Sequence, residues 1–449
     1  MKVAIYTLGC KVNQYETQAM ERELLRRGHS LIGFDGPADA YIVNTCTVTA
    51  VSDKKCRNII RRARNSAPSA VVAVCGCYAQ TDPETVAALG VDLVSGSAGR
   101  MEFLDRLEGL LQSRGGQVVE VDKALSRRDF ERLPAGRAAG RTRAMLKVED
   151  GCVNFCADCI IPSARGPVRS LPLDEAAEQA RRLAREGYRE VVLTGIEISS
   201  WGQDLKTGQT LTDLIEAVCA AAPELRVRLG SLEPRTVTED FCRRCAALPN
   251  LCPHFHLSLQ SGCDATLARM NRKYDTARYY ESLELLREFF PDSGITADLI
   301  VGFPGERPDE FTRTLDFLEK CAFSAMHVFP YSKRPGTPAA AMPDQIPKGE
   351  KEERARRAIA LAAKMERRWL ERQVGRTMPV LFEEEKDGWW RGHAPNYALV
   401  RSKGDELHNR LLDVEITGME EETLIGAPGG SINFLKGSEN ILKGFPTKI

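Results

Sequence analysis

Three closely spaced cysteines stand in the segment GCVNFCADCIIPSARGPVR, which runs from Gly151 to Arg169. Cys152, Cys156 and Cys159 form a C-x3-C-x2-C pattern directly after an apolar run. Three thiolates on one loop can bind three irons of a [4Fe–4S] cluster, which leaves the fourth iron open to another ligand. A closed zinc site instead needs four ligands, usually from paired C-x2-C units, and no such pair lies nearby in sequence. The pattern therefore predicts a cluster with an open iron.

Three further cysteines are spread over the first part of the chain: Cys10 in TLGCKVNQYE, Cys46 in VNTCTVTAVSDKK and Cys77 in CGCYAQ. Widely spaced cysteines are normally core residues, so their spacing is a weak signal. Each of them, however, follows the end of a predicted parallel strand, and such ends meet at the ligand-binding edge of an open α/β sheet. Cys75 is expected to pack within its strand, whereas Gly76 permits a turn that places Cys77 on the loop.

The amino-acid composition indicates in which cellular compartment the protein is found and what its cysteines do. The chain has 14 cysteines in 449 residues, a high number for a cytosolic protein, in which persistent disulfides are rare. Such thiols either bind metal or pack as small hydrophobes, as we expect for Cys219 and Cys321. No apolar stretch reaches the length of about 18 residues that a membrane span needs, and the N-terminus lacks the apolar core of a signal peptide. We therefore expect a cytoplasmic protein without a membrane segment.

The elements that position these cysteines follow from the periodicity of the apolar residues. Residues 1–125 show the βαβ rhythm of an open parallel sheet, and residues 126–143 are a basic, glycine-containing linker. The strands expected in the first part are Val3–Leu8, Tyr41–Val43 and Val71–Val74, and a helix is expected at Gln18–Arg27.

Strands and helices alternate again in residues 144–372, which predicts a partial (β/α)6 barrel with its chemistry at the C-terminal strand ends. This part ends in a charged helix at residues 350–372, and residues 374–438 change to short strands and turns, as in a small all-β barrel. The fold class is therefore α/β multidomain. The expected barrel strands are Ala144–Val148, Val191–Thr194, Arg226–Leu229, His254–Leu259, Ile295–Val301 and Met326–Phe329.

The segment Gly151–Arg169 resembles the cluster loop of the radical-SAM superfamily. The resemblance implies that the open iron binds S-adenosylmethionine, and that an electron from a donor such as flavodoxin or ferredoxin cleaves it to a 5′-deoxyadenosyl radical. One position departs from the superfamily pattern. The residue before the third cysteine is usually aromatic, but here it is Asp158, and Phe155 is the neighbouring ring.

Almost the whole chain resembles the radical-SAM methylthiotransferases, through HFHLSLQSGCDATLARMNRKYDT (His254–Thr276), DLIVGFPGE (Asp298–Glu306) and FPYSKRPGTPAA (Phe329–Ala340). Within this family, LGCKVNQYE, GPVRS and HVFPYSKRPGTPAA most resemble the branch that acts on N6-threonylcarbamoyladenosine in tRNA. That branch adds a methylthio group at carbon 2 of the adenine just 3′ of the anticodon.

The resemblance implies a methylthiotransferase domain, a radical-SAM core and an RNA-binding TRAM domain in that order. It implies that Cys10, Cys46 and Cys77 bind a second [4Fe–4S] cluster, which holds or delivers sulfur from a sulfur donor. S-adenosylmethionine then provides both the methyl group and the radical. Related branches act on isopentenyladenosine in tRNA or on an aspartate of a ribosomal protein. A non-catalytic iron–sulfur carrier is the alternative from another class, but it would need no open iron, barrel or RNA module.

Five residues are candidates for binding S-adenosylmethionine: Gly195, Glu197, Glu233, Ile300 and Gly302. Gly195 follows a predicted strand and resembles the turn that meets the amino group of the cofactor, although a plain βα turn explains it equally well. Glu233 stands at another strand end and is a candidate for the ribose or an ordinary surface carboxylate. Ile300 and Gly302 are expected to line the adenine pocket.

Cationic residues are candidates for binding RNA. Lys54, Arg57, Arg61 and Arg64 recur at helical spacing just beyond Cys46, which puts four cations on one helix face. Such clusters attract RNA phosphates, although a solvated helix face is the usual interpretation. The net charge does not help, because Lys+Arg and Asp+Glu both number 62. Further candidates are Arg141 and Arg143 in the linker, and Trp389, Trp390, Arg391 and Tyr397 in the TRAM-like unit.

Cys242 and Cys245 have a zinc-ligand spacing and are followed by Cys252 and His254. They fall in a helical stretch with apolar neighbours, where cysteine packs well. Packing is therefore the stronger interpretation.

Overall fold

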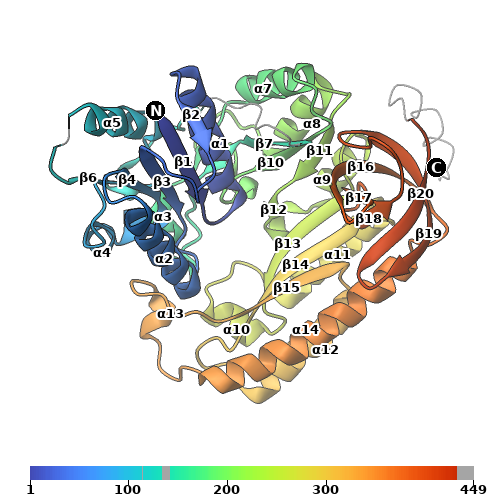
Figure 1. The fold of residues 1–449 in the computed structure, drawn as a ribbon. Helices are drawn as coiled ribbons and strands as arrows, with labels where there is room; N and C mark the ends of the chain where they lie inside the picture. The colour runs from blue at the N-terminus through green and yellow to red at the C-terminus, as the bar shows by residue number, and fades with distance from the viewer. Residues whose placement is uncertain (114, 134–141, 432–449) are drawn as a thin grey trace.

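The computed structural model describes residues 1–113, 115–133 and 142–431. Within them the chain forms an N-terminal α/β sheet, a central partial barrel and a small C-terminal barrel, and the expected fold class is confirmed (Figure 1). No helix among the described residues has the length and apolarity that crossing a bilayer requires.

The N-terminal domain is a parallel sheet of six strands in the order β2-β1-β3-β4-β5-β6. Its central strands are buried on both faces, which is why they are continuous apolar runs. Val72 and Val74 face the side covered by α2, whereas Ala73 and Cys75 face the side covered by α1 and α5. The strands are β1 (Lys2–Thr7), β2 (Ser30–Ile32), β3 (Ala40–Thr45), β4 (Val71–Gly76), β5 (Leu93–Ser95) and β6 (Val118–Glu120). The helices are α1 (Lys11–Arg26), α2 (Ala50–Ser66), α3 (Cys77–Thr81), α4 (Pro83–Ala87) and α5 (Arg100–Gln112).

Two features of this domain differ from the sequence-based expectation. The first helix begins at Lys11 rather than at Gln18, because polar side chains such as Asn13 and Glu16 are buried against the rest of the protein. The outer strands β2 and β6 and the neighbouring β5 have three residues each, which is too short for a period-two pattern to be visible.

The central domain contains the six expected parallel strands, one of which is interrupted at Gly230 to give β11 and β12. An isolated bridge between Val227 and Leu251 connects the sheet β11-β10-β7 with the sheet β12-β13-β14-β15. The strands are β7 (Arg143–Lys147), β10 (Glu190–Thr194), β11 (Arg226–Leu229), β12 (Ser231–Leu232), β13 (His254–Gln260), β14 (Gly294–Val301) and β15 (Ala325–Pro330). The covering helices are α7 (Leu173–Arg185), α8 (Leu211–Ala221), α9 (Glu239–Ala246), α11 (Thr276–Phe289) and α12 (Pro308–Cys321).

Alternate residues of these strands face opposite sides, and this alternation creates a polar concave surface. Leu146, Leu193 and Leu229 belong to the core beneath the helices. The intervening residues Lys147 and Arg228 therefore face the inside of the partial barrel.

The long helix α14 (Lys348–Glu371) runs from the central domain to the C-terminal barrel (Figure 1). Trp369 and Leu370 at its end join the apolar core of that barrel. The barrel is closed in the order β16-β17-β18-β20-β19 and fits the TRAM domain that the resemblance implies. Its strands are β16 (Thr377–Lys386), β17 (Trp389–His393), β18 (Leu399–Ser402), β19 (Leu411–Glu420) and β20 (Thr423–Ser431).

Candidate functional site

The loop with Cys152, Cys156 and Cys159 lies between β8 (Glu149–Asp150) and α6 (Ile161–Arg165), beyond the C-terminal end of β7. Gly151 has a φ of 93°, and a Cβ there would meet the carbonyl oxygen of Pro167 at 2.0 Å, so the start of the loop requires glycine. The loop is held by hydrogen bonds from Cys159 N to Cys156 O at 3.0 Å and from Ala157 N to Met270 O at 2.9 Å.

The three thiols of this loop are partly exposed and lie within electrostatic range of one another. Burial raises the pKa of Cys152 and of Cys159 to about 12, so iron has to displace tightly held protons. Among the described residues, no three His, Cys, Asp or Glu side chains converge closely enough to hold a single metal ion. Three thiols on one loop suit a cluster, in which each cysteine binds a different iron.

The second set of cysteines also comes together at one edge of its sheet. Cys10 is the N-cap of α1, Cys46 follows β3 directly, and Cys77 begins α3 directly after β4. The Cys77 thiol interacts electrostatically with both Cys10 and Cys46. Gly76 has a φ of 99°, and a Cβ there would meet the carbonyl oxygen of Thr45 at 2.5 Å, so the turn before Cys77 requires glycine.

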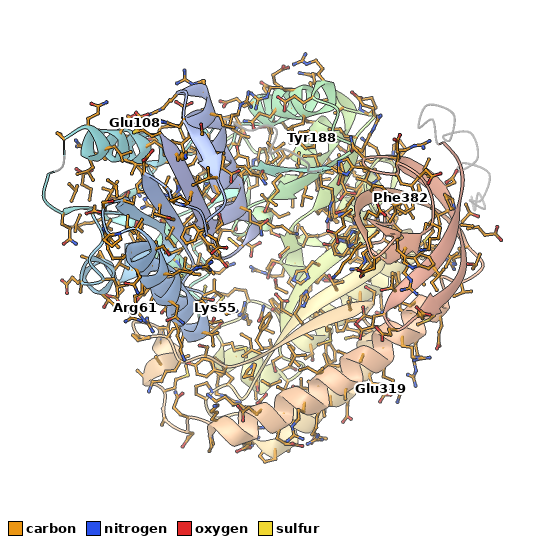
Figure 2. All side chains as sticks on the ribbon, viewed as in Figure 1. Lys55, Arg61, Glu108, Tyr188, Glu319 and Phe382 are labelled. Carbon is orange, nitrogen blue, oxygen red and sulfur yellow. The ribbon has the colours of Figure 1, made fainter. Side chains whose placement is uncertain are left out.

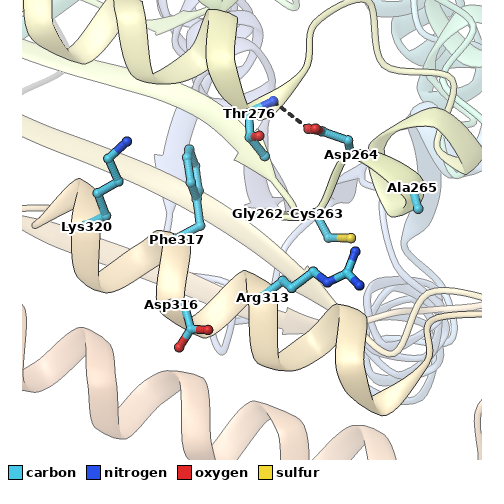
Figure 3. A pocket seen from close by; sticks show the side chains of 9 residues that line it. All are labelled: Gly262, Cys263, Asp264, Ala265, Thr276, Arg313, Asp316, Phe317 and Lys320. Carbon is cyan, nitrogen blue, oxygen red and sulfur yellow. Dashed lines mark hydrogen bonds between the residues drawn. The ribbon is translucent and has the colours of Figure 1, made fainter.

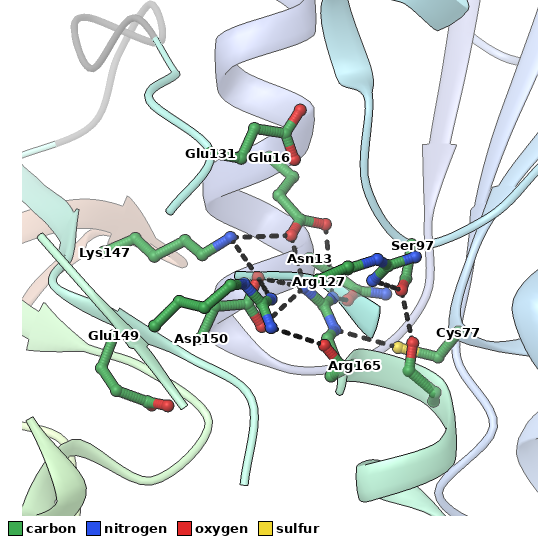
Figure 4. Close-up of polar contacts among 12 residues, drawn as sticks. Asn13, Glu16, Cys77, Ser97, Arg127, Glu131, Lys147, Glu149, Asp150 and Arg165 are labelled. Atoms are coloured by element: carbon green, nitrogen blue, oxygen red, sulfur yellow. Dashed lines mark hydrogen bonds and ion pairs between the residues drawn. The ribbon is translucent and has the colours of Figure 1, made fainter. Parts of the chain in front are cut away.

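A buried ion network connects Cys77 with the segment around Arg165, the short helix that follows Cys159 (Figure 4). Arg165, at the end of α6, is fully buried, and its Nε donates to Cys77 Sγ at 3.2 Å. Its other nitrogens donate to Glu16 Oε1 at 2.5 Å and to Asn13 Oδ1 at 2.6 Å. Lys147 Nζ donates to Asp150 Oδ2 at 2.7 Å and to Glu16 Oε1 at 3.3 Å. The radical-SAM loop and the N-terminal cysteines are thus held by the same charged groups.

Positive charge exceeds negative charge in this network. Burial alone would raise the pKa of Glu16, but Arg165, Arg100 and Lys147 lower it to about 2, so Glu16 is ionised. Asp150 is the second carboxylate, and Arg169 is a further cation at 3.3 Å from it. An excess of buried cations beside Cys77 suits an anionic group, as a thiolate-ligated iron–sulfur cluster is.

The structure brings three of the expected cofactor-binding residues to the edge beside Cys152. Glu197 follows β10, and its Oε2 accepts from Asn154 Nδ2 at 3.4 Å. Burial, together with the neighbouring Glu233, raises the pKa of Glu197 to about 7. Glu233 itself accepts from Arg235 Nε at 2.7 Å. A Cβ on Gly195 would meet Glu149 Oε2 at 2.7 Å. Close packing therefore explains this glycine as well as the proposed contact with the cofactor does.

The other two expected residues of this set lie at the C-terminal end of β14 and directly after it. Ile300 packs against the apolar cluster of Ala157, Phe303 and Tyr331, next to the cysteines. Gly302 has a φ of 70°, and a Cβ there would meet Lys351 Cγ at 2.3 Å. Gly302 is therefore needed for the packing of α14, and its role towards the cofactor stays a prediction.

The expected RNA-binding helix α2 is on the surface of the N-terminal domain, where Figure 2 shows Lys55 and Arg61. Lys54 and Arg61 are exposed. Arg57 donates to the hydroxyl of Tyr78 at 2.9 Å, and Arg64 pairs with Asp92 and with backbone carbonyls. Lys54 and Arg61 are therefore accessible to a partner. Arg57 and Arg64 already have partners within their own domain.

Further RNA-binding candidates, among them Arg143 and the two tryptophans, lie in or beside the C-terminal barrel. Arg143 begins β7 and pairs with Glu383 of β16 at 2.8 Å. Arg141 lies outside the described residues. Trp389 is covered by Arg401 and Lys403 at 4.7 and 4.3 Å, whereas Trp390 packs partly against the barrel core.

Cys242 and Cys245 are completely buried in the main core, as the apolar neighbours of α9 predict. A further cavity of about 390 Å³ lies between α10 (Asp264–Arg269) and α12, where Asp264 accepts from Thr276 N at 2.7 Å (Figure 3). None of the six cysteines predicted to bind clusters lines it.

Several residues of the site were not identified from the sequence. Glu149 is buried beside Gly195, its Oε2 accepts from Glu197 N at 2.7 Å, and burial raises its pKa well above the usual value. Arg165 and Lys147 could not be predicted as site residues, because Glu16, which they share as a partner, is distant in the chain. The signal for Lys147 was a charged residue within the predicted strand Ala144–Val148.

Family models match two parts of the chain. The model described as uncharacterized protein family UPF0004 matches residues 2–96, and the radical SAM superfamily model matches residues 146–318.

Among curated proteins, the threonylcarbamoyladenosine tRNA methylthiotransferase MtaB of Bacillus subtilis is 39% identical over 421 residues, covering 92% of this chain and 93% of the relative. A Thermotoga maritima protein of the same name is 37% identical, covering 94% of this chain and 96% of the relative. The tRNA-2-methylthio-N6-dimethylallyladenosine synthase of Pelotomaculum thermopropionicum is 32% identical, covering 95% and 97%.

Among solved structures, the radical S-adenosylmethionine methyltransferase TsrM of Kitasatospora setae, with cobalamin and a [4Fe–4S] cluster bound, has a TM-score of 0.54. The match covers 76% of this chain and 77% of the TsrM chain, at 17% sequence identity. At this identity the similarity concerns the fold alone.

Proposed function

Because the chain belongs to the radical-SAM tRNA methylthiotransferase family, we propose that it converts N6-threonylcarbamoyladenosine in tRNA to its 2-methylthio derivative. Two relatives with this substrate in their names reach 39% and 37% identity, whereas relatives named for the dimethylallyl substrate reach 32% and 34%. The motifs around Cys10 and in the loop after β15 favour the same branch.

Family membership implies S-adenosylmethionine and a [4Fe–4S] cluster, and Cys152, Cys156 and Cys159 are the residues that fit this cluster. When bound together, S-adenosylmethionine and this cluster would supply a 5′-deoxyadenosyl radical. Glu197 and Glu233 lie beside Cys152 and are proposed to bind the polar groups of S-adenosylmethionine, while Ile300 offers an apolar surface for its adenine.

We further propose a second [4Fe–4S] cluster on Cys10, Cys46 and Cys77 as the site of the transferred sulfur. The observation that carries this proposal is the contact from Arg165 to Cys77, at the centre of a buried network with more cations than carboxylates. Arg165 also orients the radical-SAM loop, because it lies in the short helix α6 that follows Cys159. The two sites are thereby held in a fixed relation, as one base that visits both would require.

The proposal includes partners of known chemistry. The radical step needs a one-electron donor such as flavodoxin or ferredoxin, and repeated turnover needs a sulfur donor. Lys54, Arg57, Arg61, Arg64, Arg141 and Arg143 are proposed to contact tRNA. Since tRNA is its substrate, we place the protein in the cytoplasm.

Reconstituted protein, S-adenosylmethionine, a chemical reductant and an anticodon stem-loop carrying threonylcarbamoyladenosine test this function. We expect 5′-deoxyadenosine and the 2-methylthio nucleoside, both measured by mass spectrometry. Cys156→Ala should abolish both products, because a cluster that loses a ligand loses its open-iron geometry. Cys219→Ala, a substitution in the core, is the matched control and should keep them. Product from an isopentenyladenosine stem-loop alone would contradict the proposed substrate.

A further inference from the structure

A cavity of about 430 Å³ lies where the three parts of the molecule meet. Helix α1 contributes Lys11 and Gln14, and the inner face of the partial barrel contributes Arg143 and Arg228. The C-terminal barrel closes the cavity with side chains that include Arg391, His393 and Tyr397.

Stacked rings give one wall of this cavity a fixed shape. Tyr397 stacks on His254 with ring centroids 4.5 Å apart and on His393 at 4.7 Å. The guanidinium of Arg228 lies 4.9 Å from the Tyr397 ring, and that of Arg143 lies 5.8 Å from it. Such a wall of rings and cations is preorganised to receive a planar, electron-rich group.

Some cations of the cavity are neutralised by an ion pair with a carboxylate, and others are not. Arg143 pairs with Glu383 at 2.8 Å, and Arg228 pairs with Glu190 at 2.8 Å. Lys11 and Arg391 also line the cavity, and neither has an ion pair with any residue that the structure describes. Lys11 is in addition within electrostatic range of both Arg143 and Arg228. Glu384 also lines the cavity and stands opposite Arg391 in the neighbouring strand, so Lys11 is the cation left over for an entering anion.

The position of Lys11 along the chain indicates which anion this is. Lys11 directly follows Cys10, a ligand of the proposed sulfur-carrying cluster, and is the first residue of α1. On adenine, carbon 2 and the N6 substituent flank N1 on the same edge of the base. A base that presents carbon 2 to the cluster therefore extends its N6 substituent to a point only a few atoms away.

We propose that this cavity receives the N6 substituent of the substrate base and that Lys11 binds its carboxylate. The inference rests on the proposed function, and it gives the physical basis for choosing a threonylcarbamoyl group over an isopentenyl group. An uncharged isopentenyl group would offer the Lys11 ammonium no counterion. Lys11 thus helps to select the substrate, whereas the cysteines bind the clusters that carry out the reaction.

The test compares binding of three stem-loop RNAs to full-length reconstituted protein. They carry threonylcarbamoyladenosine, its methyl ester, or unmodified adenosine at the same position. Wild-type protein should bind the acid about tenfold more tightly than the ester, as the loss of one charge-assisted hydrogen bond predicts. In Lys11→Gln this ratio should fall close to one, and Lys11→Arg should restore it. Lys348→Gln, at an exposed site on α14, should behave as wild type.

Two results would overturn the inference. If Lys11 contacts an RNA phosphate instead, Lys11→Gln will weaken all three RNAs by the same factor and leave the ratio unchanged. If wild-type protein binds the acid and the ester equally tightly, the protein does not recognise the carboxylate. Turnover measured in parallel separates this from the proposed function. Product without discrimination refutes the role of Lys11 alone, and discrimination without product refutes the proposed function alone.

Discussion

Cys75 and Cys77 are two positions apart in the chain but have different surroundings. Cys75 is the last side chain of β4, completely buried in the core that α1 and α5 cover. Cys77 lies beyond the turn at Gly76, in contact with Arg165. The alternation of the strand and the glycine were enough to predict this difference from the sequence. The contact with Arg165 was not predictable, because Arg165 is distant in the chain.

The first prediction follows from that difference. In a background in which Cys152, Cys156 and Cys159 are all alanine, reconstitution should give about one [4Fe–4S] cluster per chain, as three thiolates can support. Adding Cys77→Ala should remove most of this iron, whereas adding Cys75→Ala should leave it in place. Iron analysis and the visible absorption of the cluster measure the outcome. The opposite pattern would mean that Cys75 is the ligand.

The second prediction concerns Arg165. Replacing it with Met leaves Glu16 and Asp150 buried with fewer counterions, which should lower the free energy of unfolding by about 3–5 kcal/mol. Urea unfolding measures the effect, and Arg181→Met at an exposed pair on α7 should cost about 1 kcal/mol or less. Equal effects of the two substitutions would show that the buried network contributes no more than a surface ion pair.

At the scale of elements, helix α2 presents Lys54 and Arg61 to solvent. Asp53, the acidic residue on the same stretch, pairs with Arg334 at 2.6 Å and so does not neutralise them. The helical spacing of these cations was visible in the sequence, whereas the engagement of Arg57 and Arg64 with their own domain was not, because their partners come from other segments.

The third prediction is that Lys54→Glu combined with Arg61→Glu weakens tRNA binding. It should also make the dependence of log affinity on log salt concentration shallower, by about one unit for each RNA phosphate that the protein no longer neutralises. Filter binding over a salt series measures both quantities. Arg181→Glu on α7 is the charge-reversal control. Affinity that matches the control at every salt concentration would mean that this face of α2 is merely solvated.

The junction between α14 and the C-terminal barrel contains a carboxylate with a shifted pKa. Burial, together with Glu422, raises the pKa of Glu366 to about 7. Since the native state then holds a proton that the unfolded state releases, the stabilising effect is present at low pH and is lost as pH rises through about 7.

The fourth prediction is therefore that the melting temperature of the wild-type protein falls between about pH 5 and pH 8 by more than that of Glu366→Gln, which stays neutral. Thermal unfolding followed by circular dichroism measures the difference. Glu284→Gln on the exposed side of α11 should keep the slope of the wild type. If Glu366→Gln also keeps that slope, the carboxylate does not contribute to the pH dependence.

At the scale of the whole molecule, the order of the three parts could be predicted from the sequence, but the way they pack together could not. The strands of the barrel and the cysteine loops follow from local patterns of apolar residues and glycines. The interfaces depend on pairs such as Glu16 with Arg165 and Arg143 with Glu383, which lie in different domains. These pairs support the central claim, that the two sets of cysteines act on one modified base.

Nucleoside analysis of total tRNA from a strain that lacks the gene tests this claim most directly. Mass spectrometry should show that 2-methylthio-N6-threonylcarbamoyladenosine disappears and that its unmodified parent accumulates. Expression of the wild-type chain should restore the product, whereas Cys77→Ala and Cys156→Ala should each fail to do so. Disappearance of the isopentenyl methylthio nucleoside instead, with the threonylcarbamoyl product unchanged, would contradict the claim.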